Sequence, residues 1–132
     1  MKKQLYIKET GGRGRGVFCR QPIEKDEVFE ICPVIVLLAA DSDTIRASRL
    51  VDYVFNFKKE EKTLAISLGF GSLYNHAIHS NAAYWLDTDQ QVLSYYALED
   101  ILPGTEICIN YAGQPGMEFK EWFETRGIVY ED

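Results

Sequence analysis

The sequence predicts a single domain of mostly β structure. Three observations support this class: short strand-like runs follow one another closely, only two modest helical patterns occur, and no repeat or linker interrupts the chain. At 132 residues, the chain is long enough for one hydrophobic core but too short for two. We therefore expect residues 1–132 to form one unit.

The expected strands are short apolar or alternating runs that lie between polar turns. Pro33 interrupts the longest of them, which favours an edge position or a bend there, because proline has no backbone N–H to donate. The runs cover residues 4–8, 28–38, 53–57, 63–68, 83–87, 91–97 and 107–111.

Two stretches have helical spacing. Residues 41–52 follow this pattern after a Ser42–Asp43 cap. Residues 117–126 place aromatic side chains on one side and are closed by Gly127. We expect one or two short helices from these segments.

Charge and composition narrow the function classes. The net charge of −6 and the pI near 4.9 argue against general nucleic-acid binding, which requires a basic face. An acidic surface suits a Lys- or Arg-rich partner, although solubility is the favoured explanation of the charge alone. The longest apolar run, residues 34–40, has only the length of a strand. We expect a soluble protein that contacts neither membrane nor nucleic acid directly.

The three cysteines, Cys19, Cys32 and Cys108, are spread singly along the chain. This pattern fits neither a disulfide framework nor a zinc cluster, so we expect buried, reduced thiols and no metal. Reduced thiols indicate an intracellular protein. It would be cytoplasmic if bacterial, and a host nucleus is a further location if the source is a virus or a secreted effector.

Two segments carry glycine and polar residues in patterns that suit a ligand. Residues 11–16 contain four glycines that can bring backbone groups close to a ligand, although an ordinary hairpin turn explains them equally well. Residues 69–81 pass from a Gly-Phe-Gly turn to Asn75 and His76, whose side chains suit a polar ligand or a simple turn. His76 and His79 have no carboxylate or thiol beside them and make a poor metal site.

Three ordered motifs resemble those of SET-domain protein lysine methyltransferases. They are Gly14-Arg15-Gly16-Val17-Phe18, Tyr74-Asn75-His76 followed by Ser80-Asn81, and Gly104-Thr105-Glu106-Ile107 continuing to Asn110-Tyr111. The chain departs from the family at Ala77, where a serine is usual, and at Ser80, where a proline is usual. Because the Cys-rich flanks of larger members are absent, the chain is most similar to the smallest viral and bacterial type.

The resemblance implies a β-clip fold of small curved sheets, with a knot-like threading of the C-terminal segment. It also implies a short insert at residues 40–62 and a C-terminal flank at residues 114–132 that covers the site. The implied activity is methyl transfer from S-adenosylmethionine to the lysine ε-amine of a basic, histone-like protein or peptide.

The resemblance further implies roles for individual residues. Tyr111 is the expected catalytic residue, orienting the amine without acting as a general base. Ile109, two positions earlier, faces the lysine channel. The expected cofactor-binding residues are Gly14, Arg15, Gly16, Asn75, His76, Tyr111 and Trp122. The expected channel residues are Tyr53, Tyr74, Tyr95 and Ile109.

The sequence is also compatible with other functions. The same fold without turnover would be a peptide- or cofactor-binding module, and a homodimer is compatible with the sequence. A metal-dependent hydrolase built on His76, His79 and the Asp87/Asp89 pair lacks a nucleophile arrangement and ranks last. Several of the tyrosines, and Trp122, are also explained by ordinary packing.

Overall fold

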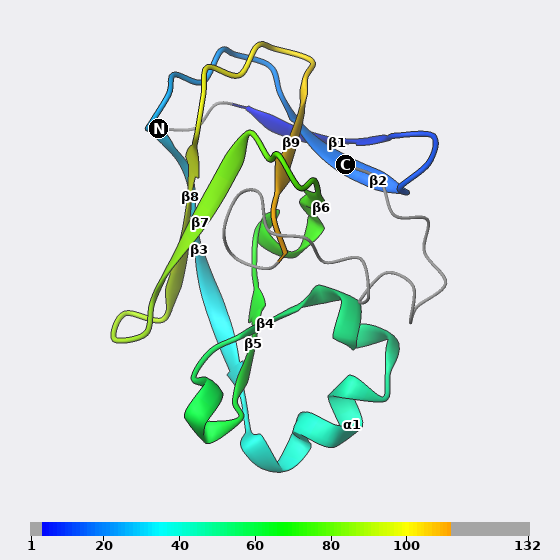
Figure 1. The fold of residues 1–132 in the computed structure, drawn as a ribbon, viewed down its shortest axis with the longest axis vertical. Coiled ribbons are helices and arrows are strands. Elements are labelled where there is room, and N and C mark those ends of the chain that lie inside the picture. Colours follow the sequence, from blue (N-terminus) through cyan, green and yellow to red (C-terminus); the bar gives the residue numbers. More distant parts are fainter. Residues whose placement is uncertain (1–3, 112–132) are drawn as a thin grey trace.

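The structure, a computed structural model, describes residues 4–111 and confirms a mostly β fold (Figure 1). The strands of this part form two sheets, one in the order β1-β2-β9-β6 and the other in the order β4-β5-β3-β8-β7. Their bounds are β1 Leu5–Glu9, β2 Arg15–Cys19, β3 Val28–Leu37, β4 Val54–Asn56, β5 Leu64–Ser67, β6 Asn75–His76, β7 Ala82–Asp87, β8 Val92–Ala97 and β9 Glu106–Ile109.

The glycine-rich segment forms the turn of the β1–β2 hairpin. Gly11 and Gly14 have φ of 90° and 71°, in the left-handed region that glycine adopts without strain. Thr10 closes the turn, because its N–H and its hydroxyl both donate to the Gly14 carbonyl at 2.8 Å. The hairpin turn expected as one alternative is therefore present, and β2 continues from it into the core.

Strand β3 lies inside the larger sheet, so the edge position suggested by Pro33 is wrong. β3 pairs with β8 up to Pro33 and with β5 from Val34 to Leu37. Pro33 thus lies where the strand changes partners, at the end of a ladder, and its missing N–H is tolerated there.

The expected helix at residues 41–52 is broken into short pieces. A 3₁₀ turn at Ala39–Asp41 leads into α1, Ser42–Arg46, and a second 3₁₀ helix covers Arg49–Tyr53. Ser48, which has extended backbone angles, ends the first helix: its hydroxyl donates to the Ile45 carbonyl at 2.7 Å and accepts from the Leu50 N–H at 3.2 Å. Serine competes in this way with the backbone bonds that would continue a helix. Further 3₁₀ turns cover Lys59–Glu61 and Gly71–Leu73.

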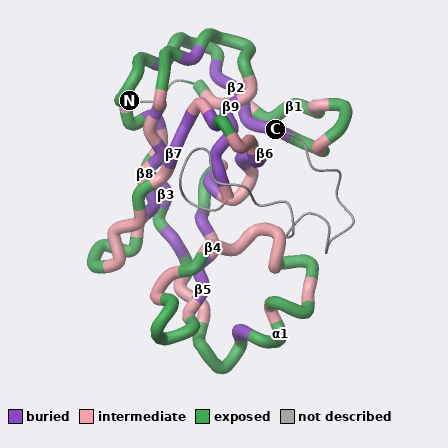
Figure 2. The backbone as a smooth tube through the Cα atoms, in the orientation of Figure 1, coloured by how far each residue is buried: buried purple, intermediate pink, exposed green. Residues whose placement is uncertain are grey.

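The core is built from buried residues of β2 and β9 in one sheet and of β3, β5, β7 and β8 in the other (Figure 2). All three cysteines are free and buried in it, as expected. Burial raises the pKa of Cys32 and of Cys108 to about 12, so these thiols stay protonated at neutral pH. Within residues 4–111, no helix is long and apolar enough to cross a membrane, and no cluster of potential metal ligands occurs.

Candidate active site

The site is built where β6 runs parallel to β9. Asn75 pairs with Cys108 and His76 with Ile109, so the second and third motifs come together. The backbone N–H of Tyr111 then donates to Nδ1 of His76 at 3.0 Å. The knot-like threading of the last segment stays a prediction, and the flank at 114–132, with Trp122 and the helical pattern at 117–126, lies outside the described residues.

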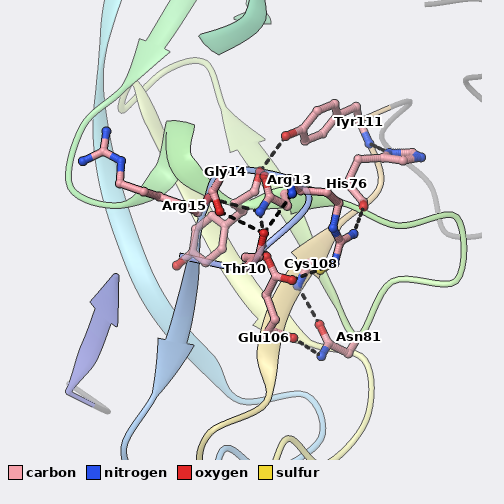
Figure 3. A network of polar contacts seen from close by, with 11 residues as sticks. Thr10, Arg13, Gly14, Arg15, His76, Asn81, Glu106, Cys108 and Tyr111 are labelled. Atoms are coloured by element: carbon pink, nitrogen blue, oxygen red, sulfur yellow. Dashed lines mark hydrogen bonds and ion pairs between the residues drawn. The ribbon is translucent and has the colours of Figure 1, made fainter. Parts of the chain in front are cut away.

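Tyr111 is held by its hydroxyl as well as its backbone. The hydroxyl donates to the carbonyl oxygen of Tyr74 at 2.8 Å, and the ring lies 5.1 Å from the His76 ring (Figure 3). Burial, more than any nearby charge, raises the pKa of the Tyr111 phenol above its ordinary value. The phenol is therefore neutral at physiological pH, where it can donate or accept a hydrogen bond but is a poor base.

Glu106, at the start of β9, connects this strand to the β1–β2 hairpin turn and to β6. Its carboxylate accepts from the Arg13 guanidinium at 2.6 Å and from the Asn75 amide at 2.7 Å (Figure 3). The other arm of Arg13 donates to the His76 carbonyl at 2.8 Å. A Cβ at Gly16 would collide with the Glu106 carboxylate, so a larger residue here would force that carboxylate to move.

The Asn75 side chain donates hydrogen bonds to other parts of the protein. Besides Glu106, its amide nitrogen donates to the Arg15 carbonyl at 3.1 Å, and so joins β6 to the β1–β2 hairpin. Direct contact of Asn75 and His76 with a cofactor stays a prediction. The structure adds that both residues also fix the backbone of the site.

Asn81, the last residue of the second motif, binds the backbone of β9 with its side chain. Its amide nitrogen donates to the Glu106 carbonyl and its oxygen accepts from the Cys108 N–H, both at 2.9 Å. An asparagine can serve a strand backbone in this way because it carries both a donor and an acceptor. The position of Asn81 in the motif is therefore explained by its hydrogen bonds to β9.

A cavity of about 430 Å³ opens beside Tyr111. Its wall includes the aromatic side chains of Tyr53 and Phe55 from the insert, Tyr74 before β6, Tyr84 in β7 and Tyr111. The charged residues Arg46, Asp52 and Lys59 share this wall. A pocket of this size and lining suits a long side chain with an apolar stem and a cationic end.

The expected channel residues divide between this cavity and the core. Tyr53 and Tyr74 line the cavity. Tyr95 and Ile109 are fully buried and are not among its lining residues. The Tyr95 hydroxyl donates instead to Ser67 Oγ and to the Gly71 carbonyl, both at 3.1 Å.

Sequence reasoning missed three residues of the site. Arg13 was passed over because the motif begins one residue later, and its partners lie far along the chain. Tyr84 and Phe55 lie in expected strands, where alternation indicates which side chains share a face but not which of them border a cavity.

The family of the chain follows from a match to the SET-domain family model, which covers residues 14–112. This chain belongs to the SET-domain family of protein lysine methyltransferases. A histone-lysine N-methyltransferase specific for H3 lysine-37, from Schizosaccharomyces pombe, is 31% identical over 125 residues, which are 94% of this chain and 80% of that protein. These findings confirm the family resemblance, whereas the viral or bacterial type stays a prediction.

Solved structures agree with the SET fold. A candidate histone methyltransferase from Plasmodium falciparum is 30% identical with a TM-score of 0.67, covering 84% of this chain and 95% of that one. The Neurospora histone lysine methyltransferase DIM-5 shares the fold at 22% identity and a TM-score of 0.67, over 87% of this chain and 54% of that one. A chain of the Chaetomium thermophilum Polycomb complex bound to S-adenosylmethionine also shares the fold. Its identity is 18% and its TM-score 0.72, over 96% of this chain and 17% of that one.

Proposed function

We propose that this SET domain transfers a methyl group from S-adenosylmethionine to the ε-amine of a lysine in a basic, histone-like protein or peptide. The observation that carries the proposal is the position of Tyr111, whose backbone is bonded to His76 while its ring borders an aromatic cavity. The named activity of the fission-yeast relative supports the same reaction. The acidic balance of the chain, −6, supports a basic substrate through electrostatic attraction.

The residues around the first motif fit the proposed cofactor. A Cβ at Gly14 would meet nothing within 4 Å, so a ligand can approach the backbone of the turn there. The neighbouring Arg15 is exposed, and its carbonyl oxygen accepts a hydrogen bond from the Asn75 amide nitrogen at 3.1 Å. We expect Gly14, Arg15 and Gly16 to offer backbone groups to the cofactor, with Asn75 and His76 beside them and Trp122 from the C-terminal flank.

S-adenosylmethionine, when bound, supplies a methyl group activated by the sulfonium. The protein's task is alignment and desolvation. Tyr53, Phe55 and Tyr84 give the lysine stem an apolar surface, and the cations Arg46 and Lys59 line the same cavity. Desolvation and these like charges both lower the pKa of the ammonium, against the opposite charge of Asp52, and so favour the neutral, nucleophilic amine. The Tyr111 hydroxyl, held by the Tyr74 carbonyl, lies at the cavity wall and orients that amine.

A peptide array incubated with S-adenosylmethionine carrying a labelled methyl group tests this proposal. Lysine-containing basic peptides should acquire label, whereas the same peptides with lysine replaced by arginine should not. Binding of S-adenosylmethionine without any transfer would instead identify a silent binding module. An intracellular location and a homodimer are further proposals, which fractionation and sedimentation measurements test.

A further inference from the structure

Glu30, in β3, accepts two hydrogen bonds from the segment that leads into the site. One carboxylate oxygen accepts from the Tyr74 hydroxyl at 2.5 Å, and the other accepts from the Phe70 N–H at 3.0 Å. The carboxylate lies close against Gly69, where a Cβ would come within 2.6 Å of it. Gly69 also has a φ of 61°, so both its space and its backbone favour glycine. This arrangement fixes residues 69–74 to β3.

A β-bulge turns Glu30 toward this segment. Val28 pairs with Tyr96 and Glu30 with the adjacent Tyr95, so Phe29 is an extra residue in β3. A bulge of this kind redirects the side chains that follow it. Phe29 is buried and Glu30 half-buried, although strict alternation would place neighbours on opposite faces. The charged side chain is thereby brought to the core side of the sheet.

Tyr74 connects Glu30 to the site. Its buried ring packs 4.8 Å from the Tyr95 ring and 6.0 Å from the Phe29 ring, while its hydroxyl is bound by Glu30. The carbonyl oxygen of the same residue accepts the Tyr111 hydroxyl at 2.8 Å. A tyrosine side chain has only two torsions, so holding its far end restricts its backbone.

We propose that Glu30 is a positioning residue, which fixes the carbonyl oxygen of Tyr74 and through it the direction of the Tyr111 hydroxyl. The inference rests on the proposed methyl transfer. Glu30 is not among the residues that line the cavity, so its effect is indirect. Misplacement of a reacting group by 1 Å costs up to about 100-fold in rate, so a smaller shift of Tyr111 should cost about tenfold.

Two variants separate this role from simple packing. Glu30→Gln removes the charge at nearly constant shape, and Tyr74→Phe removes only the hydroxyl while keeping the ring in the core. We expect kcat to fall about tenfold in both, with the Kd for S-adenosylmethionine and the peptide KM changed by less than about twofold. Glu99→Gln, at an exposed loop position, is the matched control and should retain wild-type kinetics. If Glu30→Gln fails to fold, Tyr74→Phe decides alone.

A spectroscopic measurement makes the test independent of turnover. With 3-fluorotyrosine at position 111, the ¹⁹F resonance should move in Glu30→Gln and Tyr74→Phe but not in Glu99→Gln. An unmoved resonance, unchanged kcat in Tyr74→Phe, or a loss explained wholly by weaker cofactor binding would each overturn the inference. If the wild-type protein transfers no methyl group while the resonance moves, the proposed function fails but the positioning of Tyr111 stands.

Discussion

Arg13 and Glu106 are 93 positions apart in sequence, yet their side chains form an ion pair with a nitrogen–oxygen distance of 2.6 Å. One lies in the turn of the β1–β2 hairpin and the other begins β9. Their side chains are only 27% and 13% exposed, so the pair is less screened by solvent than a surface salt bridge. The pair links the hairpin turn to β9, the strand that leads to Tyr111.

We expect Arg13→Ala to lower the free energy of unfolding by about 1–3 kcal/mol, because it leaves the partly buried Glu106 carboxylate without its cation. The affinity for the cofactor should also fall, because the hairpin turn loses its ion pair with β9. Urea unfolding and calorimetric titration with S-adenosylmethionine measure the two effects. Glu61→Gln, in the exposed Lys58–Glu61 pair at 3.9 Å, is the control and should change stability by less than about 0.5 kcal/mol. Equal effects of the two variants would contradict this role.

The buried thiols predict a loss of stability in alkali. Burial raises the pKa of Cys32 and of Cys108 from 9.0 to about 12. Between these values the unfolded chain has released protons that the folded chain still holds, so the free energy of unfolding falls as pH rises. The slope is up to about 1.4 kcal/mol per pH unit for each thiol. Urea unfolding from pH 8 to pH 11 should show this fall, and Cys32→Ala should make it shallower. An unchanged slope in that variant would refute the assignment.

The position two before Tyr111 predicts the number of methyl groups added. Ile109 is fully buried outside the cavity wall and has no hydroxyl to hold the amine or a water in place, so a methylated lysine can turn its lone pair back toward the cofactor. We expect successive methylation, up to two or three groups. Mass spectrometry of the peptide at long reaction times measures the product. A plateau at one group would mean that another residue, such as Tyr53 on the cavity wall, restricts the product.

The C-terminal flank is predicted to complete the site. A chain ending at Pro115 lacks the aromatic segment 117–126 and should lose S-adenosylmethionine binding, because no other aromatic flank is available in the sequence. Trp122→Ala in the full chain should weaken binding about tenfold if its ring stacks on the adenine. Equilibrium binding of the cofactor tests both variants. Unchanged affinity and kinetics in the truncated chain would rule out this function of the flank.

Strands and motifs were predictable because their signals are local. Apolar or alternating runs located seven of the described strands but missed β2 and β6, and the resemblance to SET domains pointed to the segments that form the site. Glu30 was not predictable, because a bulge reverses its expected side and its partner Tyr74 lies 44 positions away. Ser48 ended a helix that spacing alone would continue, since its hydroxyl bonds both sides of the break. Long-range polar contacts and irregular backbone thus account for most of what the sequence left open.

The central claim is that the Tyr111 hydroxyl aligns the methyl transfer. Single-turnover transfer of a labelled methyl group from S-adenosylmethionine to a basic peptide, compared between wild-type protein and Tyr111→Phe, tests it most directly. Tyr96→Phe, at a half-buried position in β8, is the matched control. We predict that Tyr111→Phe binds the cofactor with unchanged affinity and loses at least about 90% of the rate, since only a hydrogen bond at the reacting centre is removed. Wild-type turnover by Tyr111→Phe would contradict the assignment of the catalytic centre.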